Sequence, residues 1–220
     1  MSSIVVSGDT SGSVTLSAPA IANTTVLTLP SVSGTVLTSA TGQILTSPTI
    51  TSPTITGAVI SAMASSILIS GTAVASTSGT SIDFTGIPSW AKRVTVMFNG
   101  VSTNGTSNTL IQIGSGSVTT TGYTAVSVRT YAANSINTST AGFIYGFDAA
   151  AFSIYGNVIF TNISGNSWVG NGTLGSVAST AMTIQMGGGI TLGGVLDRVR
   201  ITTVNGTDTF DAGSINIMYE

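Results

Sequence analysis

In the stretch Arg93-Val-Thr-Val-Met-Phe-Asn-Gly100, Val94, Val96 and Phe98 occupy every second position. Successive side chains of a β-strand point to opposite faces, so this period of two predicts a strand with one buried face. The closing Asn99-Gly100 pair predicts a tight turn, because both residues tolerate a positive φ.

Two stretches nearer the C-terminus repeat this pattern. Apolar residues alternate with polar ones over Arg198–Thr202 and over Ser214–Tyr219. The pairs Asn104-Gly105 and Asn205-Gly206 add turn signals of the same kind. Several strands separated by such turns are typical of a sandwich or jelly-roll-like fold. We therefore expect residues 79–220 to form a globular, antiparallel β-sandwich head, jelly-roll-like and part of a mainly β chain.

The composition excludes several classes of function. Charged residues make up 5 % of the 220 residues, against roughly 25 % in an average soluble domain. Five cations in the whole chain give no basic patch for a nucleic acid partner. Cysteine and histidine are both absent, which excludes disulfides, thiolate metal sites and the usual general base.

The character of the chain changes near residue 80. Every aromatic residue lies at or after Phe84, and every charge except Asp9 lies at or after Asp83. The first part contains short related phrases, of which Thr46-Ser-Pro-Thr-Ile50 and Thr51-Ser-Pro-Thr-Ile55 form a tandem pentapeptide. Short repeats are typical of one small unit stacked along an axis.

A single copy of this repetitive segment could not bury its own aliphatic side chains, and its strand edges would be unprotected. Winding several copies around a common axis would bury the aliphatic stripe and pair the edges. We therefore predict an extended, homotrimeric shaft that includes residues 41–78. Ile60, Met63, Ile67 and Val74 are spaced as in a short trimeric helical segment. A more irregular shaft is an equal alternative there.

The stretch Gly57–Ala75 runs 19 residues without a charge, close to the length of about 20 that spans a bilayer. Five Ser and Thr residues interrupt it, and no Lys or Arg near either end would set an orientation. We expect no membrane insertion.

Residues that could carry chemistry are few. Asp208 and Asp211 form the only close pair of carboxylates, which fits a glycosidase pair, a calcium site or a plain polar turn. Gly170-Asn-Gly172-Thr-Leu-Gly175 fits the dinucleotide fingerprint, but the residues that follow it are typical of a strand rather than of the required helix. We expect no enzyme activity, no catalytic or metal-binding residues and no cofactor.

The two tryptophans are the largest side chains. We expect Trp90, at a strand entrance, to cap the core. Trp168 either belongs to the core or forms an exposed platform for a sugar ring, with Asn166 and Asn171 as hydrogen-bonding neighbours. These three are the candidate receptor-binding residues.

The phrasing of several segments is similar to that of bacteriophage proteins. The opening Ser7-Gly-Asp-Thr-Ser-Gly-Ser-Val-Thr-Leu-Ser-Ala-Pro19 and the Thr-Ser-Pro-Thr-Ile repeats resemble tail-fibre proteins and their shafts. Ile82-Asp-Phe-Thr-Gly-Ile-Pro-Ser-Trp90 and the strand that follows resemble a C-terminal head of phage structural proteins. The resemblance implies a trimeric virion component with N-terminal anchoring, which we place in residues 1–40, and a distal head.

These observations lead us to expect a phage tail fibre, located in the virion. Its N-terminus would dock on the tail, the baseplate or another virion protein. Its head would contact a host cell-surface glycan or protein. The alternative is a capsid decoration or head-fibre protein with a purely structural role.

Overall fold

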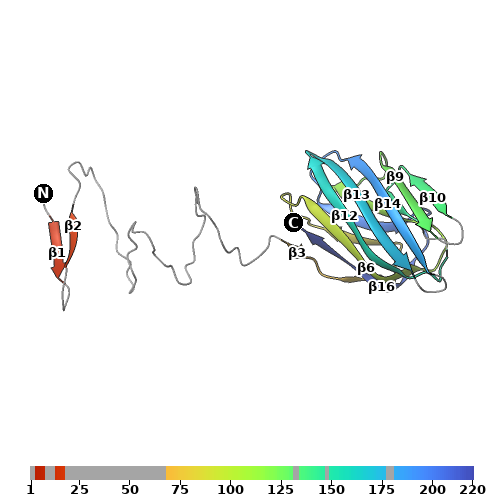
Figure 1. Ribbon diagram of the computed structural model, residues 1–220, viewed down its shortest axis with the longest axis horizontal. Helices are drawn as coiled ribbons and strands as arrows, with labels where there is room; N and C mark the ends of the chain where they lie inside the picture. Colours follow the sequence, from red (N-terminus) through yellow and green to blue (C-terminus); the bar gives the residue numbers. More distant parts are fainter. Residues whose placement is uncertain (1–2, 8–12, 18–67, 131–133, 147–148, 177–180) are drawn as a thin grey trace. The chain divides into compact units, whose positions relative to one another are not determined.

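The computed structural model describes residues 3–7, 13–17, 68–130, 134–146, 149–176 and 181–220 (Figure 1). The chain divides into two compact units, Met1–Val59 and Ile60–Glu220. In the first unit, β1 (Ser3–Ser7) pairs antiparallel with β2 (Ser13–Ser17). The pentapeptide repeats and the remainder of the predicted anchor and shaft up to residue 67 lie outside the described residues.

In its described part, the second unit contains a nine-stranded antiparallel sheet, here the large sheet. Its strands lie in the order β10 (Ser135–Ser139), β9 (Thr124–Thr130), β14 (Met182–Thr191), β13 (Ser167–Ser176), β12 (Ile154–Ser164), β6 (Arg93–Thr103) and β16 (Phe210–Tyr219), followed by β3 (Ile69–Ser70) and β4 (Val74–Ala75). Both β3 and β4 pair with β16.

A five-stranded antiparallel sheet, here the small sheet, packs against the large one. Its order is β11 (Phe143–Tyr145), β7 (Thr109–Ser115), β15 (Arg198–Thr203) and β5 (Ser81–Thr85), with β8 (Ser117–Val118) paired to β7. Three strand pairs are nested in sequence: β6 with β16, β7 with β15, and β9 with β14. The first and third pairs lie in the large sheet and the second in the small one, so the chain passes repeatedly between the two layers.

The core lies between the two sheets. Val94, Val96 and Phe98 of β6 all point into it, as their alternation predicts, and so do Val199 and Ile201 of β15. Aromatic rings join the layers: the centroids of Phe98 and Tyr145 are 5.5 Å apart, and those of Phe143 and Phe160 are 4.8 Å apart. The predicted mainly β, antiparallel sandwich is confirmed for this unit.

The prediction of a tight turn at Asn99-Gly100 is wrong. Gly100 adopts a φ of 66° inside β6, and Gly213 of β16, at 90°, lies against it. The pairing of β6 with β16 shifts register at this point, so the glycine signal marks an irregularity within two long strands. Asn104-Gly105 and Asn205-Gly206 do lie in connections between strands, as predicted.

The second unit takes in residues that we assigned to the shaft. Because β3 and β4 pair with β16, the sheet begins before residue 79. Val74 lies in β4, so a helical heptad that reaches this residue is wrong. Residues 68–75 of the apolar stretch Gly57–Ala75 hold these two strands, and the rest of it lies outside the described residues. Within the described residues, no helix has the length and hydrophobicity to span a membrane.

Candidate binding groove

The outward face of the large sheet carries no charge over five adjacent strands. Buried residues alternate with exposed or half-exposed ones along most of β9, β14, β13 and β12, and half-buried residues alternate with exposed ones along β10; the more exposed set points away from the core. We call this more exposed set the uncharged face. It consists of Ile136, Thr138, Thr124, Val126, Val128, Thr130, Thr183, Gln185, Gly187, Gly189, Thr191, Ser167, Val169, Asn171, Thr173, Gly175, Tyr155, Asn157, Ile159 and Thr161.

The outward face of the small sheet differs in charge. Arg200 of β15 and Asp83 of β5 are register partners and form an ion pair at 2.7 Å. Arg198 pairs with Asp197 at 2.8 Å, and this contact lowers the pKa of the Asp197 carboxyl. The uncharged face differs from this outward face in having no charged residue among its positions.

A groove crosses the uncharged face along β14. Gly187 lies between Val126 of β9 and Asn171 of β13 in one cross-strand row, and Gly189 occupies the next outward position. Three adjoining hollows of about 610, 370 and 260 Å³ follow these glycines. The first and third hollows share Val126 and Gly187, and the first and second share Thr124. We call these three adjoining hollows together the β14 groove.

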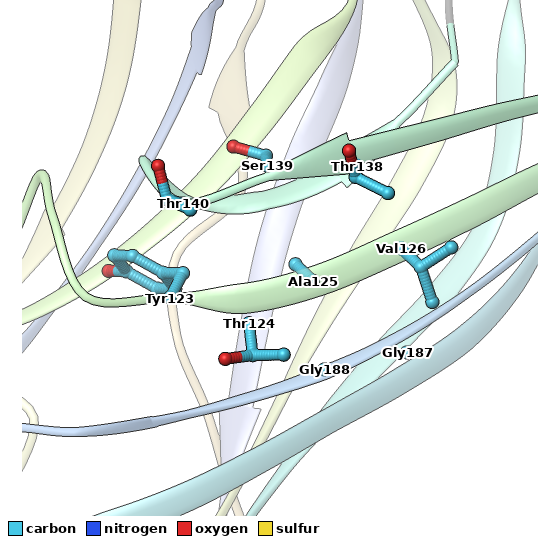
Figure 2. Close-up of a pocket in the computed structure, with 9 residues that line it drawn as sticks. All are labelled: Tyr123, Thr124, Ala125, Val126, Thr138, Ser139, Thr140, Gly187 and Gly188. Carbon is cyan, nitrogen blue, oxygen red and sulfur yellow. The ribbon is translucent and has the colours of Figure 1, made fainter.

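Figure 2 shows the largest hollow, in which Thr138 and Ser139 of β10 lie beside Ala125 and Val126 of β9. The other labelled lining residues are Tyr123, Thr124, Thr140, Gly187 and Gly188. Hydroxyl groups and exposed backbone therefore supply most of the polar atoms of this hollow. Such a surface offers hydrogen bonds to a neutral, polar ligand and no charge to attract an ionic one.

Gly187 and Gly188 of β14 are glycines for two different physical reasons. A Cβ at Gly188 would lie 2.5 Å from the carbonyl oxygen of Thr124, so the close approach of β9 requires glycine there. A Cβ at Gly187 would meet no atom nearer than 3.8 Å. Packing within the chain therefore does not demand glycine at position 187, and its absent side chain leaves the groove open.

Tyr123, which lines the largest hollow, is held in place by hydrogen bonds of its buried hydroxyl group. Its hydroxyl accepts a hydrogen bond from the Ile113 backbone N–H at 2.9 Å and lies 3.0 Å from the carbonyl oxygens of Ile113 and Thr119. Burial raises the pKa of Tyr123 to about 12, although the hydrogen bond with Ile113 acts in the opposite direction. The Tyr123 side chain thus connects the residue just before β9 to β7 of the small sheet.

Of the two alternatives for Trp168, the core position is confirmed and the exposed platform is wrong. Trp168 is 3 % exposed, and its indole belongs to the core, with only a margin bordering the second hollow. Residues three apart on a strand point to opposite faces, so Asn171 is exposed on the uncharged face while Trp168 points inward. Asn166 lies half-buried between β12 and β13, where its backbone carbonyl accepts a hydrogen bond from Leu192. Of the three candidates, only Asn171 points outward on the uncharged face, where it is the register partner of Gly187.

The prediction that Trp90 caps the core is also wrong. Its side chain is 42 % exposed and rests on Tyr219, with 5.7 Å between the ring centroids. Ile87 and Ala91, on either side of it in sequence, are buried instead. The turn after Pro88 therefore directs the smaller neighbours inward and the indole outward.

The two neighbouring carboxylates are structural. Asp208 accepts hydrogen bonds from the Asn205 side chain at 2.6 Å and from the Ser107 backbone N–H at 2.9 Å, and both lower the pKa of its carboxyl. Asp211 accepts one from the Ser102 hydroxyl. Asp208 lies in the connection between β15 and β16, as the polar-turn interpretation of this pair predicts, whereas Asp211 lies inside β16. Among the described residues, no three Asp or Glu side chains gather in a way that could hold a metal ion.

The glycines that fit the dinucleotide fingerprint lie inside a strand. Gly170, Gly172 and Gly175 all belong to β13, whose neighbour along the chain is β14, also a strand. This agrees with the expected strand-like continuation. Gly170 and Gly172 point inward, where a Cβ would lie 2.6 Å from the Phe160 ring and from the Asn157 carbonyl oxygen respectively. These two glycines serve close packing between β13 and β12.

Sequence reasoning missed the residues that form the groove. Thr124, Val126 and Val128 alternate with buried residues, but in Thr124–Thr130 both sets contain small side chains, so the pattern is weak. The available signal was the run Gly187-Gly-Gly189 inside a strand-like segment, because glycine within a strand often marks a close approach of a ligand or another backbone.

No protein-family model, curated protein or solved structure matches this chain.

Proposed function

We propose that this chain is a fibre protein of a bacteriophage virion whose C-terminal β-sandwich binds the host surface through the β14 groove. In this proposal the N-terminal region docks on the tail, the baseplate or another virion protein, and the shaft is a homotrimer. The nested pairs of β6–β16, β7–β15 and β9–β14 support a jelly-roll-like description of the head.

The observation that carries the binding role is the groove on an uncharged sheet face. Gly187 keeps the groove open although a side chain would fit there without a clash. Glycine within a strand costs roughly 0.5–1 kcal/mol relative to alanine. Gly175 of β13 also has room for a Cβ on the same face. The position of Gly187 in the lining of two of the hollows, and not glycine alone, therefore supports contact with an external molecule.

The chemistry of the lining favours a neutral glycan as the ligand. The hydroxyls of Thr124, Thr138 and Thr140 line the largest hollow and can exchange hydrogen bonds with sugar hydroxyls. The amide of Asn171, the register partner of Gly187 on the same face, can do the same. The apolar side chains of Val126 and Val169 can cover the less polar faces of sugar rings. A charged polysaccharide would lose hydration there without gaining a counter-charge, so it is the poorer ligand.

The test compares two glycine substitutions in the full-length protein. Gly187→Thr places a side chain in the groove, whereas Gly175→Thr places one on the same face outside the three hollows, where a Cβ also has room. We expect Gly187→Thr to reduce binding to host cells and to extracted neutral surface glycans at least tenfold. Gly175→Thr should bind as the wild type does. Equal binding by all three proteins would contradict the proposal.

The alternative is a capsid decoration or head-fibre protein. Immunogold labelling of virions distinguishes the two: label on the tail supports the fibre, and label over the shell supports decoration. We propose binding without catalysis, because Asp83, Asp197 and Asp208 are each engaged in ion pairs or turns. A fall in the polymer size of host polysaccharide during incubation with the protein would contradict this part.

A further inference from the structure

A cluster of exposed apolar side chains lies where the described part of the second unit begins. Ile69 of β3 is the register partner of Tyr219 in β16, and the Tyr219 ring contacts Trp90. Leu68, Ile69 and Trp90 are 44 %, 42 % and 42 % exposed. Figure 1 shows β3 and the C-terminus at the same end of the large sheet. We call Leu68, Ile69, Trp90 and Tyr219 the entry corner.

Charged groups lie beside this corner. Arg93 forms an ion pair with Glu220 at 2.5 Å, and the backbone N–H groups of Lys92 and Arg93 donate to the Glu220 carbonyl. An apolar centre with a charged rim is the common composition of a protein–protein interface. The exposed edge of β3 gives a further reason for a partner, because open strand edges pair readily with other chains.

The position of the corner along the chain identifies the partner. Leu68 directly follows residues 1–67, which contain one charge and no aromatic residue and which we propose to assemble with other copies. Each residue extends the chain by at most about 3.6 Å. If the copies associate up to residue 67, their Leu68 residues must therefore lie close to one another and to the common axis.

We propose that the entry corner is the contact between the second units of three copies of this chain, with Trp90 and Tyr219 covered by neighbouring copies. This inference rests on the trimeric assembly of the proposed function. It adds which surface of the sandwich faces the axis, and it leaves the uncharged face free for a ligand.

The absence of cysteine permits a direct test in the full-length protein. Leu68→Cys places a thiol in the corner. Val204→Cys is the matched control, because Val204 is 55 % exposed and lies beyond the opposite end of β16, about 30 Å away for a ten-residue strand. With a short bismaleimide, we expect Leu68→Cys to give covalent dimers on a denaturing gel, at least tenfold more than Val204→Cys gives.

Acrylamide quenching of tryptophan fluorescence supplies a second readout. Trp168 is buried, so the difference between the wild type and Trp90→Phe reports Trp90. A covered corner predicts weak quenching of that difference signal, no stronger than that of Trp168.

The native mass of the same samples distinguishes a failure of the entry-corner contact from a failure of the trimeric fibre on which it rests. A trimeric mass with efficient Leu68→Cys cross-linking and a shielded Trp90 supports the inference. A trimeric mass with equal cross-linking of both cysteine variants and a freely quenched Trp90 overturns the inference and leaves the fibre standing. A monomeric mass overturns the trimer and this inference together, whereas the groove is tested independently by Gly187→Thr.

Discussion

At the scale of single residues, Gly188 has no room for a Cβ, whereas its neighbour Gly187 does. We predict that Gly188→Ala lowers the free energy of unfolding by about 1–3 kcal/mol, because the new Cβ would press on the backbone of Thr124 and Ala125. Gly187→Thr should leave it unchanged or raise it by up to about 1 kcal/mol. Urea unfolding of both variants measures this, and equal destabilisation by the two would contradict the proposed reason for Gly187.

The raised pKa of Tyr123 predicts that the free energy of unfolding falls at alkaline pH. Its pKa is about 12 in the folded protein and about 10 in an unfolded chain. The unfolded state therefore loses its proton first, and stability falls from pH 10 to 12 by up to about 1.4 kcal/mol per unit. Burial also raises the pKa of Tyr145, which adds to the loss.

The control for this prediction is Tyr123→Phe. It should lower stability at pH 7 by about 1–3 kcal/mol, because the Ile113 N–H loses its acceptor, and it should flatten the fall above pH 10. Urea midpoints from pH 7 to 12 test this, and an unchanged pH slope in the variant would refute the assignment to Tyr123.

Residue-level patterns predicted burial well only where one face was clearly apolar. Val94, Val96 and Phe98 gave β6 its inward face correctly. Trp168, Asn166 and Asn171 were grouped by closeness in sequence, but strand alternation places Trp168 and Asn171 on opposite faces. Applying the period of two to Ser167–Ser176 would have separated them.

At the scale of strands, β3 and β4 form an edge of the large sheet, and a substitution just after β4 tests how much this edge contributes to stability. Ser76 is fully buried, and its hydroxyl donates to the Ala212 carbonyl at 2.8 Å while its N–H donates to Gly213 at 3.0 Å. We predict that Ser76→Ala costs about 1 kcal/mol in the free energy of unfolding. The exposed Ser78 provides the control: Ser78→Ala should change stability by less than about 0.5 kcal/mol. A neutral Ser76→Ala would show that this edge contributes little.

The strands of this fold were partly predictable. β6, β15 and β16 follow from alternation, but the irregularity at Gly100 and Gly213 does not, because a positive φ fits a turn and a strand irregularity equally well. The boundary near residue 80 came from a change in composition. The aliphatic residues just before it, such as Ile69 and Val74, pair with β16 through backbone hydrogen bonds, which composition does not report.

At the scale of the whole second unit, charge is distributed unequally between the two sheets. The small sheet carries the Asp83–Arg200 pair, whereas none of the outward positions that form the uncharged face of the large sheet is charged; Arg129 of β9 lies at a half-buried position of the other set. We predict that binding to host cells changes less than twofold between low salt and about 0.5 M NaCl, because screening acts only on charges. A decline of tenfold or more, measured by cell pull-down, would indicate that charged residues outside the groove carry the interaction.

The native mass of the full-length protein in solution tests the central claim, a multi-copy fibre with a binding head, most directly. Size exclusion with light scattering should give three times the 21.9 kDa chain mass, because we propose that the charge-poor N-terminal repeats bury their aliphatic side chains against partner copies. A soluble species at 21.9 kDa would contradict the trimeric shaft, and residues 1–67 would then have to serve as an anchor that orders on a different partner.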